Sequence, residues 1–137
     1  MSGWTGKLLR VNLSTGSSQV EDIPGEWLHE YIGGRGVADR YLWQELNPRV
    51  DPLSPDNKLL FATGPLTGTP VPCGARYMVV TKGALTNVIT TSNSGGHWGP
   101  ELKFAGYDLL LIEGRAAHPV YLFIYDDVVQ IRDARAW

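Results

Sequence analysis

Two glycine-rich segments between Gly64 and Tyr107 constrain the fold of this 137-residue chain more than any other feature. The first covers residues 64–77 and reads GPLTGTPVPCGARY; the second covers 93–107 and reads NSGGHWGPELKFAGY. Each segment follows a predicted strand and connects it to the next element, and it has few bulky side chains. Loops of this composition let amide groups approach a ligand closely, because glycine has no side chain that keeps the ligand away.

The pattern around these segments predicts a strand-dominated α+β domain. Hairpins are expected near both ends of the chain, and short strands and helices between them. The predicted strands are 7–13, 18–23, 58–63, 76–81, 88–92, 108–113, 120–125 and 128–132, and the predicted helices are 26–32, 37–46 and 101–105. Because no regular βαβ alternation appears, we expect largely antiparallel sheets within one domain over 1–137.

Charge and hydropathy exclude several classes of partner. The net charge is −2, with 12 basic and 14 acidic residues and no polybasic run, so we expect no nucleic-acid partner. The longest strongly apolar run, Leu109–Ile112, is too short to span a membrane. The first residues lack the charged and apolar regions of a secretory signal, so a cytoplasmic location is expected.

Cysteine usage limits the redox chemistry that this chain can hold alone. Cys73 is the single cysteine of the sequence. It therefore cannot form an internal disulfide, and it cannot by itself build an iron–sulfur cluster or a cysteine-rich zinc site. Any redox metal would come with a cofactor or be held by segments outside this chain.

The glycine-rich segments contain the candidate ligand-binding residues. Arg76 directly follows the first loop, where an arginine can give a bidentate bond to a phosphate or carboxylate, or can be a surface charge. Residues 93–96 (NSGG) leave one strand before a helix. They can bind an anion through N–H groups or Mg²⁺ through oxygens, or they can form an ordinary turn.

Other polar motifs are weaker candidates. Residues 33–36 (GGRG) suggest a phosphate cradle or a helix–helix corner, but they lack the spacing of a dinucleotide fingerprint. His97 has no carboxylate or cysteine partner in sequence, and Cys73 has no evident base beside it. We interpret Glu101 and Lys103 as solvated charges. The chain has no paired carboxylates, H-x-x-x-H pattern or serine elbow, and therefore no complete catalytic constellation.

Several ordered motifs give the chain a specific resemblance to a known family. They occupy residues 6–16, 51–59, 64–69, 74–77, 93–96 and 101–108, within a match from Trp4 to Asp133. The chain resembles the N-terminal domain of the tungsten-containing aldehyde:ferredoxin oxidoreductase family. The resemblance implies two largely antiparallel β-sheets that form a base for a tungsten (or molybdenum) bis-pyranopterin cofactor. Further domains would supply a [4Fe–4S] cluster and most of the substrate pocket.

The resemblance also implies roles for individual residues. Arg76 would lie between the pterin and the cluster and bond to both. Asn93 would offer its backbone carbonyl to the Mg²⁺ that bridges the two pterin phosphates, and Gly95 would contact the cofactor through its backbone. Members oxidise aldehydes to carboxylic acids and pass electrons to ferredoxin. The expected partners are therefore ferredoxin or another electron-transfer subunit and the remaining domains of the enzyme, with a homodimer as a further possibility.

The sequence departs from the family pattern because it ends at Trp137. Family members continue through a second glycine-rich segment that completes the Mg²⁺–phosphate site, and then through the cluster cysteines. We therefore expect a truncated chain that folds partly or wholly but is not catalytic alone. The alternative is a stand-alone structural or assembly module that keeps the fold without redox activity.

Overall fold

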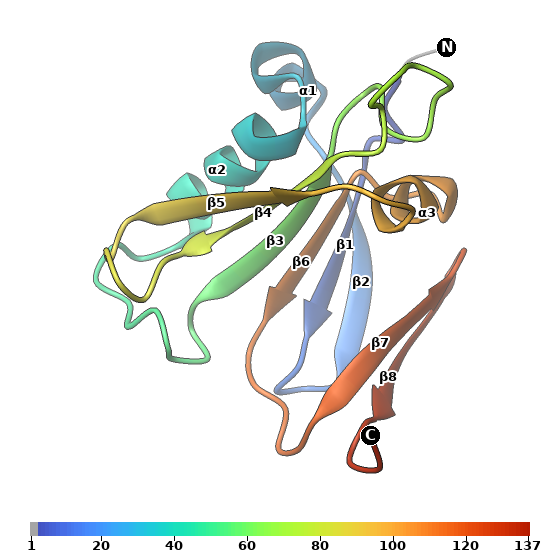
Figure 1. Ribbon diagram of the computed structural model, residues 1–137. Helices are drawn as coiled ribbons and strands as arrows, with labels where there is room; N and C mark the ends of the chain where they lie inside the picture. Colours follow the sequence, from blue (N-terminus) through green and yellow to red (C-terminus); the bar gives the residue numbers. More distant parts are fainter. Residues whose placement is uncertain (1–2) are drawn as a thin grey trace.

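A six-stranded mixed sheet forms the centre of the computed structural model, which describes residues 3–137 (Figure 1). The strands run in the order β2-β1-β6-β3-β4-β5. Their bounds are β1 Lys7–Asn12, β2 Ser17–Asp22, β3 Lys58–Thr63, β4 Tyr77–Lys82, β5 Ile89–Ser94 and β6 Leu109–Glu113. The β1–β6 pair is parallel, and the other neighbouring pairs are antiparallel.

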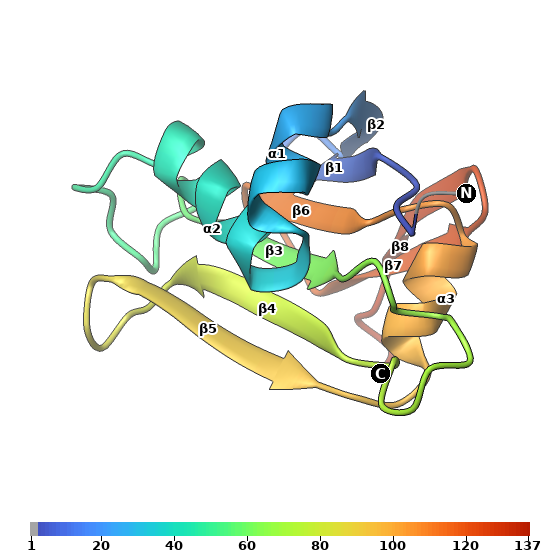
Figure 2. The ribbon, with the colours of Figure 1, turned by 90° about the horizontal axis from the view of Figure 1, so that it is seen from above.

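Three helices and a two-stranded sheet complete the chain as described. The helices are α1 Gly25–Tyr31, α2 Gly34–Glu45 and α3 Trp98–Phe104, and the second sheet pairs β7 Val120–Tyr125 with β8 Val128–Asp133. α1 and α2 cover one face of the large sheet, whereas α3 and the β7–β8 hairpin lie on the other side (Figures 1 and 2). The predicted α+β class and its largely antiparallel sheets are confirmed.

Alternating apolar residues give the sheet two buried faces. On β1, Leu8 joins the core cluster under α1 and α2, whereas its neighbour Leu9 joins the cluster under the hairpin. On the central strand β6, Leu109 and Leu111 face the first cluster and Leu110 faces the second. This period of two follows from the pleat of a strand, which points successive side chains to opposite faces. The sheet is therefore sandwiched between two apolar layers.

Three predicted boundaries were wrong by two or three residues. α2 begins at Gly34 instead of residue 37, and α3 begins at Trp98 instead of residue 101. Proline is tolerated in the first turn of a helix, where its missing N–H would have no intrahelical acceptor, so Pro100 does not delay α3. β5 continues to Ser94 because Asn93 pairs with Met78 and Ser94 pairs with Tyr77.

A buried lysine fastens the connection between α2 and β3. The Nζ atom of Lys82 donates to the backbone oxygens of Pro48 at 2.8 Å and Val50 at 2.6 Å. Its ammonium group therefore has carbonyl oxygens in place of water, which a buried charge requires.

None of the helices in residues 3–137 has the length and apolar character needed to cross a bilayer.

Candidate functional site

The first glycine-rich segment lines an open cleft of about 370 Å³ between the end of β3 and the start of β4. Gly34 at the start of α2 borders the cleft, and so do Arg76 and Met78. The backbone folds tightly here: a Cβ atom on Gly74 would lie 2.8 Å from the carbonyl oxygen of Leu66. The loop therefore needs glycine at position 74, because a side chain would collide with the backbone.

Of the three sequence-predicted cofactor residues, Arg76 lines this cleft, and Asn93 and Gly95 lie against the Arg76 side chain. The Nη1 atom of Arg76 donates to the Oδ1 atom of Asn93 at 2.5 Å. A Cβ atom on Gly95 would lie 3.9 Å from both Cδ and Nε of Arg76, so the glycine backbone runs along the arginine side chain. Arg76 and Asn93 are exposed. Within residues 3–137 the guanidinium has no other hydrogen-bond acceptor, so its remaining N–H groups can meet a ligand.

The backbone carbonyl of Asn93 faces the open edge of the sheet. Hydrogen-bonded and non-hydrogen-bonded pairs alternate along an antiparallel ladder. Gly83 N–H donates to the carbonyl of Val88, which identifies that pair as hydrogen-bonded. Asn93 pairs with Met78 five positions further along, so this is a non-hydrogen-bonded pair. Because β5 is an edge strand, the carbonyl of Asn93 points away from β4 and is available as an oxygen ligand.

The GGRG segment at 33–36 turns out to form one corner of the same cleft. It makes the turn between α1 and α2, where a Cβ on Gly33 would lie 3.2 Å from the carbonyl oxygen of Thr63. A Cβ on Gly34 would lie 3.6 Å from Cγ of Met78. The helix–helix corner reading is therefore correct, and the segment also lets the helices approach the first glycine loop closely.

The interpretation of Lys103 as a solvated charge was wrong. Its side chain is only 9% exposed and forms an ion pair with Asp108, whose side chain is 2% exposed. Lys103 packs along the first glycine loop, where a Cβ on Gly68 would lie 3.7 Å from its Cγ. Glu101 on the same helix is exposed, in agreement with the prediction.

Sequence reasoning also missed the buried polar residues near the cleft. Thr63, Thr67 and Asp108 are each at most 5% exposed. Thr67 stands three residues after Gly64, a spacing at which a threonine hydroxyl commonly bonds backbone within a turn. That local signal could have identified Thr67. Nothing local identifies Asp108 as buried, because its partners Gly6 and Thr63 are 102 and 45 positions away and Lys103 lies across the end of α3.

The other candidate residues remain without chemical partners. Cys73 is exposed on the first loop with φ of 64°, and His97 precedes α3. In residues 3–137 no hydrogen bond or ion pair links either side chain to an ionisable group. No group of three or more histidine, cysteine, aspartate or glutamate side chains in the same residues could hold a metal ion.

The main charge cluster lies at the far end of β3 from the cleft. Arg10 forms ion pairs with Glu21, Glu45 and Glu113, and Lys58 pairs with Glu45 and Glu113. Burial alone would raise the pKa of Glu45 and of Glu113. Hydrogen bonds and positive charge from Arg10 and Lys58 outweigh burial and lower both pKa values. This cluster is scaffold and does not reach the cleft.

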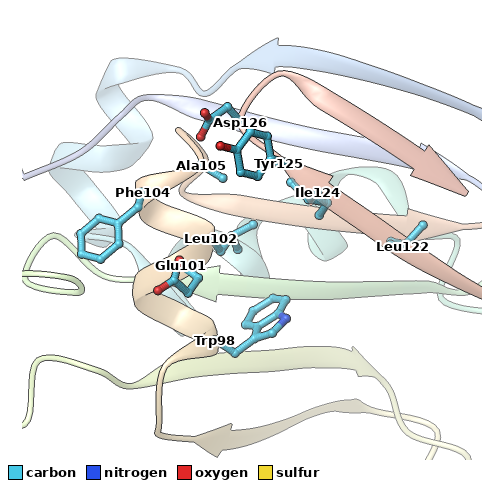
Figure 3. A pocket seen from close by; sticks show the side chains of 9 residues that line it. All are labelled: Trp98, Glu101, Leu102, Phe104, Ala105, Leu122, Ile124, Tyr125 and Asp126. Carbon is cyan, nitrogen blue, oxygen red and sulfur yellow. The ribbon is translucent and has the colours of Figure 1, made fainter.

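A second cleft of about 280 Å³ lies between α3 and β7 (Figure 3). Its apolar lining includes Trp98 and Leu102 from the helix and Leu122 and Ile124 from the strand. The carboxylates of Glu101 and Asp126 border it. It contains none of the residues that the sequence predicted for the cofactor.

Comparison with known proteins identifies the family to which this chain belongs. Residues 8–137 match the family model described as the N-terminal domain of aldehyde ferredoxin oxidoreductase. The chain is 54% identical to a tungsten-containing aldehyde ferredoxin oxidoreductase of Pyrococcus abyssi over its whole length, which is 23% of that protein. It is 42% identical to the WOR-like subunit of an aliphatic sulfonate oxidoreductase of Pyrococcus furiosus, over 98% of this chain and 22% of that one.

A solved structure has the same fold. The active site complex BamBC of benzoyl coenzyme A reductase, with bound 1,5-dienoyl-CoA, contains a chain that superposes with a TM-score of 0.96 at 40% identity. The match covers 98% of this chain and 21% of the other. The chain thus spans less than a quarter of the length of the relatives that it matches.

Proposed function

The chain belongs to the N-terminal domain family of aldehyde ferredoxin oxidoreductases, and we propose that it forms one wall of a tungsten (or molybdenum) bis-pyranopterin site. One observation carries the proposal. Asn93 and Gly95 of the second glycine-rich segment lie against the side chain of Arg76 from the first segment, and Arg76 lines the cleft.

The chemistry of this wall fits a phosphate-bearing cofactor with a bridging cation. The unpaired N–H groups of Arg76 suit phosphate oxygens or the polar edge of a pterin. The outward carbonyl of Asn93 is a hard oxygen ligand of the kind that Mg²⁺ prefers. Gly95 allows close approach of the cofactor to the backbone. When bound, the cofactor supplies the redox chemistry, and these residues bind and orient it.

The proposed activity is that of the whole protein, not of this chain alone. We propose that it oxidises aldehydes to carboxylic acids, and that electrons leave through a [4Fe–4S] cluster held by segments outside this chain. Ferredoxin or another electron-transfer subunit in the cytoplasm would accept them. The names of the relatives support this, since they include tungsten-containing aldehyde ferredoxin oxidoreductases. Other relatives act on sulfonates or glyceraldehyde-3-phosphate, so the substrate depends on the other domains.

Arginine replacement in the full-length protein tests the proposal. Arg76→Ala should reduce tungsten or molybdenum and pterin per protein severalfold, because a hydrogen bond to a charged group contributes about 1.5–3 kcal/mol. Arg76→Lys should reduce the metal and pterin content less than Arg76→Ala does. Lysine keeps the positive charge but lacks the planar fork of the guanidinium. Metal analysis and pterin quantification on purified protein provide the measurement.

Arg49→Ala provides the matched control, because Arg49 is an exposed arginine on the connector between α2 and β3. Its metal and pterin content should equal that of the unmodified protein. Equal content in the Arg76→Ala protein would rule out the proposed role of Arg76.

A further inference from the structure

Hydrogen bonds on either side of the Thr63–Gly64 peptide bond connect the core of the sheet to Arg76. The hydroxyl of Thr63, at the end of β3, donates to the carbonyl of Asp108, immediately before β6, and this bond is buried. The next residue, Gly64, donates its N–H to the hydroxyl of Thr67, which in turn donates to the carbonyl of Arg76, and these two bonds are partly buried. Asp108, Thr63 and Thr67 are three of the four buried polar or charged residues among residues 3–137. Buried polar groups are costly unless each finds partners, so their concentration on one path calls for an explanation.

Asp108 anchors the core end of this path. Its Oδ2 atom accepts a hydrogen bond from Gly6 N–H at 2.7 Å, and its Oδ1 atom pairs with the ammonium of Lys103. Its backbone carbonyl accepts from both the N–H and the hydroxyl of Thr63, at 2.9 and 3.0 Å. Asp108 therefore fixes the end of β3, which is the point where the first glycine loop leaves the sheet.

Thr67 closes the loop itself. Its hydroxyl accepts from Gly64 N–H at 3.0 Å and donates to the carbonyl of Arg76 at 3.1 Å. One hydroxyl can do both, because it carries one donor and two acceptor lone pairs. Nearer the tip of the same loop, Gly68 N–H donates to the carbonyl of Gly74 at 3.1 Å. The two ends of the loop are thus tied through one side chain.

We propose that Thr67 and Asp108 are positioning residues for Arg76. Thr67 holds the Arg76 backbone against the start of the loop, and Asp108 holds that start against the core of the sheet. The guanidinium is exposed, and its one side-chain partner in residues 3–137 is Asn93, so its placement depends on how its backbone is held. That this positioning serves cofactor binding rests on the proposed function. That Thr67 and Asp108 position Arg76 does not.

The test compares Thr67→Val with Thr67→Ser in the 137-residue chain. Valine keeps the shape of threonine without the hydroxyl, and serine keeps the hydroxyl. In Thr67→Val we expect the amide of Gly64 to exchange with solvent about tenfold faster or more, since its acceptor is lost. The NMR signal of the Arg76 side-chain Nε–H should shift and broaden. Thr67→Ser should restore both observables.

Thr69→Val is the matched control. Thr69 lies in the same loop and its hydroxyl donates to the carbonyl of Leu66 at 2.8 Å, but it does not contact Arg76. This variant should leave the Arg76 signal unchanged. Exchange of the β6 amides should stay the same in all three variants, which separates a local effect from a general loss of folding. Asp108→Asn should shift the Arg76 signal in the same direction as Thr67→Val.

The outcomes separate this inference from the proposed function. An unchanged Arg76 signal in Thr67→Val overturns the positioning role, whatever the metal content of the full-length protein. A shift that Thr67→Ser fails to reverse also overturns it. If Thr67→Val displaces Arg76 but Arg76→Ala retains full metal and pterin content, the positioning role stands and the proposed function fails.

Discussion

At the scale of residues, a few charged side chains are buried with dedicated partners. The pair of Lys103 and Asp108 is almost fully enclosed, and the carbonyl of Gly3 accepts a further bond from Lys103 at 3.1 Å. By contrast, the ion pair of Lys7 and Asp22 at the sheet edge is exposed at both side chains. Burial decides how much stability is lost when one partner of a pair is removed, because an enclosed charge without a partner cannot recover its lost hydration.

Removing Asp108 should therefore be far more damaging than removing Asp22. We expect Asp108→Ala to lower the free energy of unfolding by about 3–5 kcal/mol, since it leaves the buried ammonium of Lys103 without its carboxylate partner and the Gly6 N–H without its acceptor. The matched Asp22→Ala should cost less than about 1 kcal/mol. Urea denaturation of both variants measures the difference, and similar losses would contradict the assignment of Asp108 as a buried anchor.

The sequence could identify candidate site residues, which stay a prediction, but not the residues that hold them. Arg76, Asn93 and Gly95 lie within motifs that are legible along the chain. Lys103 was misjudged because its partner Asp108 is five residues away across the end of a helix, and Asp108 in turn binds Gly6, 102 positions earlier. Contacts of that range depend on the order of strands in the sheet, which no local pattern predicts.

At the scale of elements, ion pairs join α2 to the strands beneath it. Arg10 on β1 contacts Glu45 at the end of α2 and Glu113 at the end of β6, and Lys58 on β3 contacts the same two carboxylates. Because Arg10 also pairs with Glu21 on β2, four strands and a helix meet at this cluster. The element types were predictable from apolar periodicity and from glycine and proline breaks. The starts of α2 and α3 and the end of β5 were not predictable. Strand pairing and helix packing extend these elements beyond the residues whose own propensities favour them.

This cluster should make stability depend on pH in the acid range. The folded chain lowers the pKa of Glu45 and Glu113 below the ordinary value of 4.5. Below about pH 5 the unfolded chain therefore binds more protons than the folded one, and the free energy of unfolding should fall as pH falls through the folded pKa values. Burial raises the pKa of Asp39, which acts in the opposite direction.

Urea denaturation at several pH values between 7 and 3 measures this effect. Arg10→Met should flatten the decrease, because it removes one of the two cations that lower the pKa of Glu45. It should also reduce stability at pH 7 by about 1–3 kcal/mol, less than for a fully buried pair. The same slope in the variant as in the unmodified chain would contradict the role of Arg10.

At the scale of the whole molecule, the large sheet joins two cores into one unit. One core packs against α1 and α2, and the other packs against α3 and the β7–β8 hairpin. Leu122 and Ile124 of β7 contact the second core. The hairpin shares no backbone ladder with the large sheet, so these side chains attach it.

Truncation in the hairpin should therefore destabilise the entire chain. We expect Leu122→Ala to lower the free energy of unfolding by about 1–3 kcal/mol, the low end of the range for a core leucine because Leu122 is half-buried. Val20→Ala, at an exposed position on β2, should change it by less than about 0.5 kcal/mol. Transitions followed by circular dichroism and by tryptophan fluorescence should coincide. A separate early transition would show that the hairpin unfolds alone.

The central place of β6 also determines when the binding wall can form during synthesis. Leu8 of β1 pairs with Leu109 of β6, 101 positions later, and β3 pairs with β6 on the other side. Until β6 leaves the ribosome, β1 and β3 each have one unpaired edge, a state prone to aggregation and slow to resolve. Asp108 lies directly before β6 and anchors the loop of Arg76. The proposed cofactor loading at this wall would therefore have to wait until β6, which ends at Glu113, has been translated.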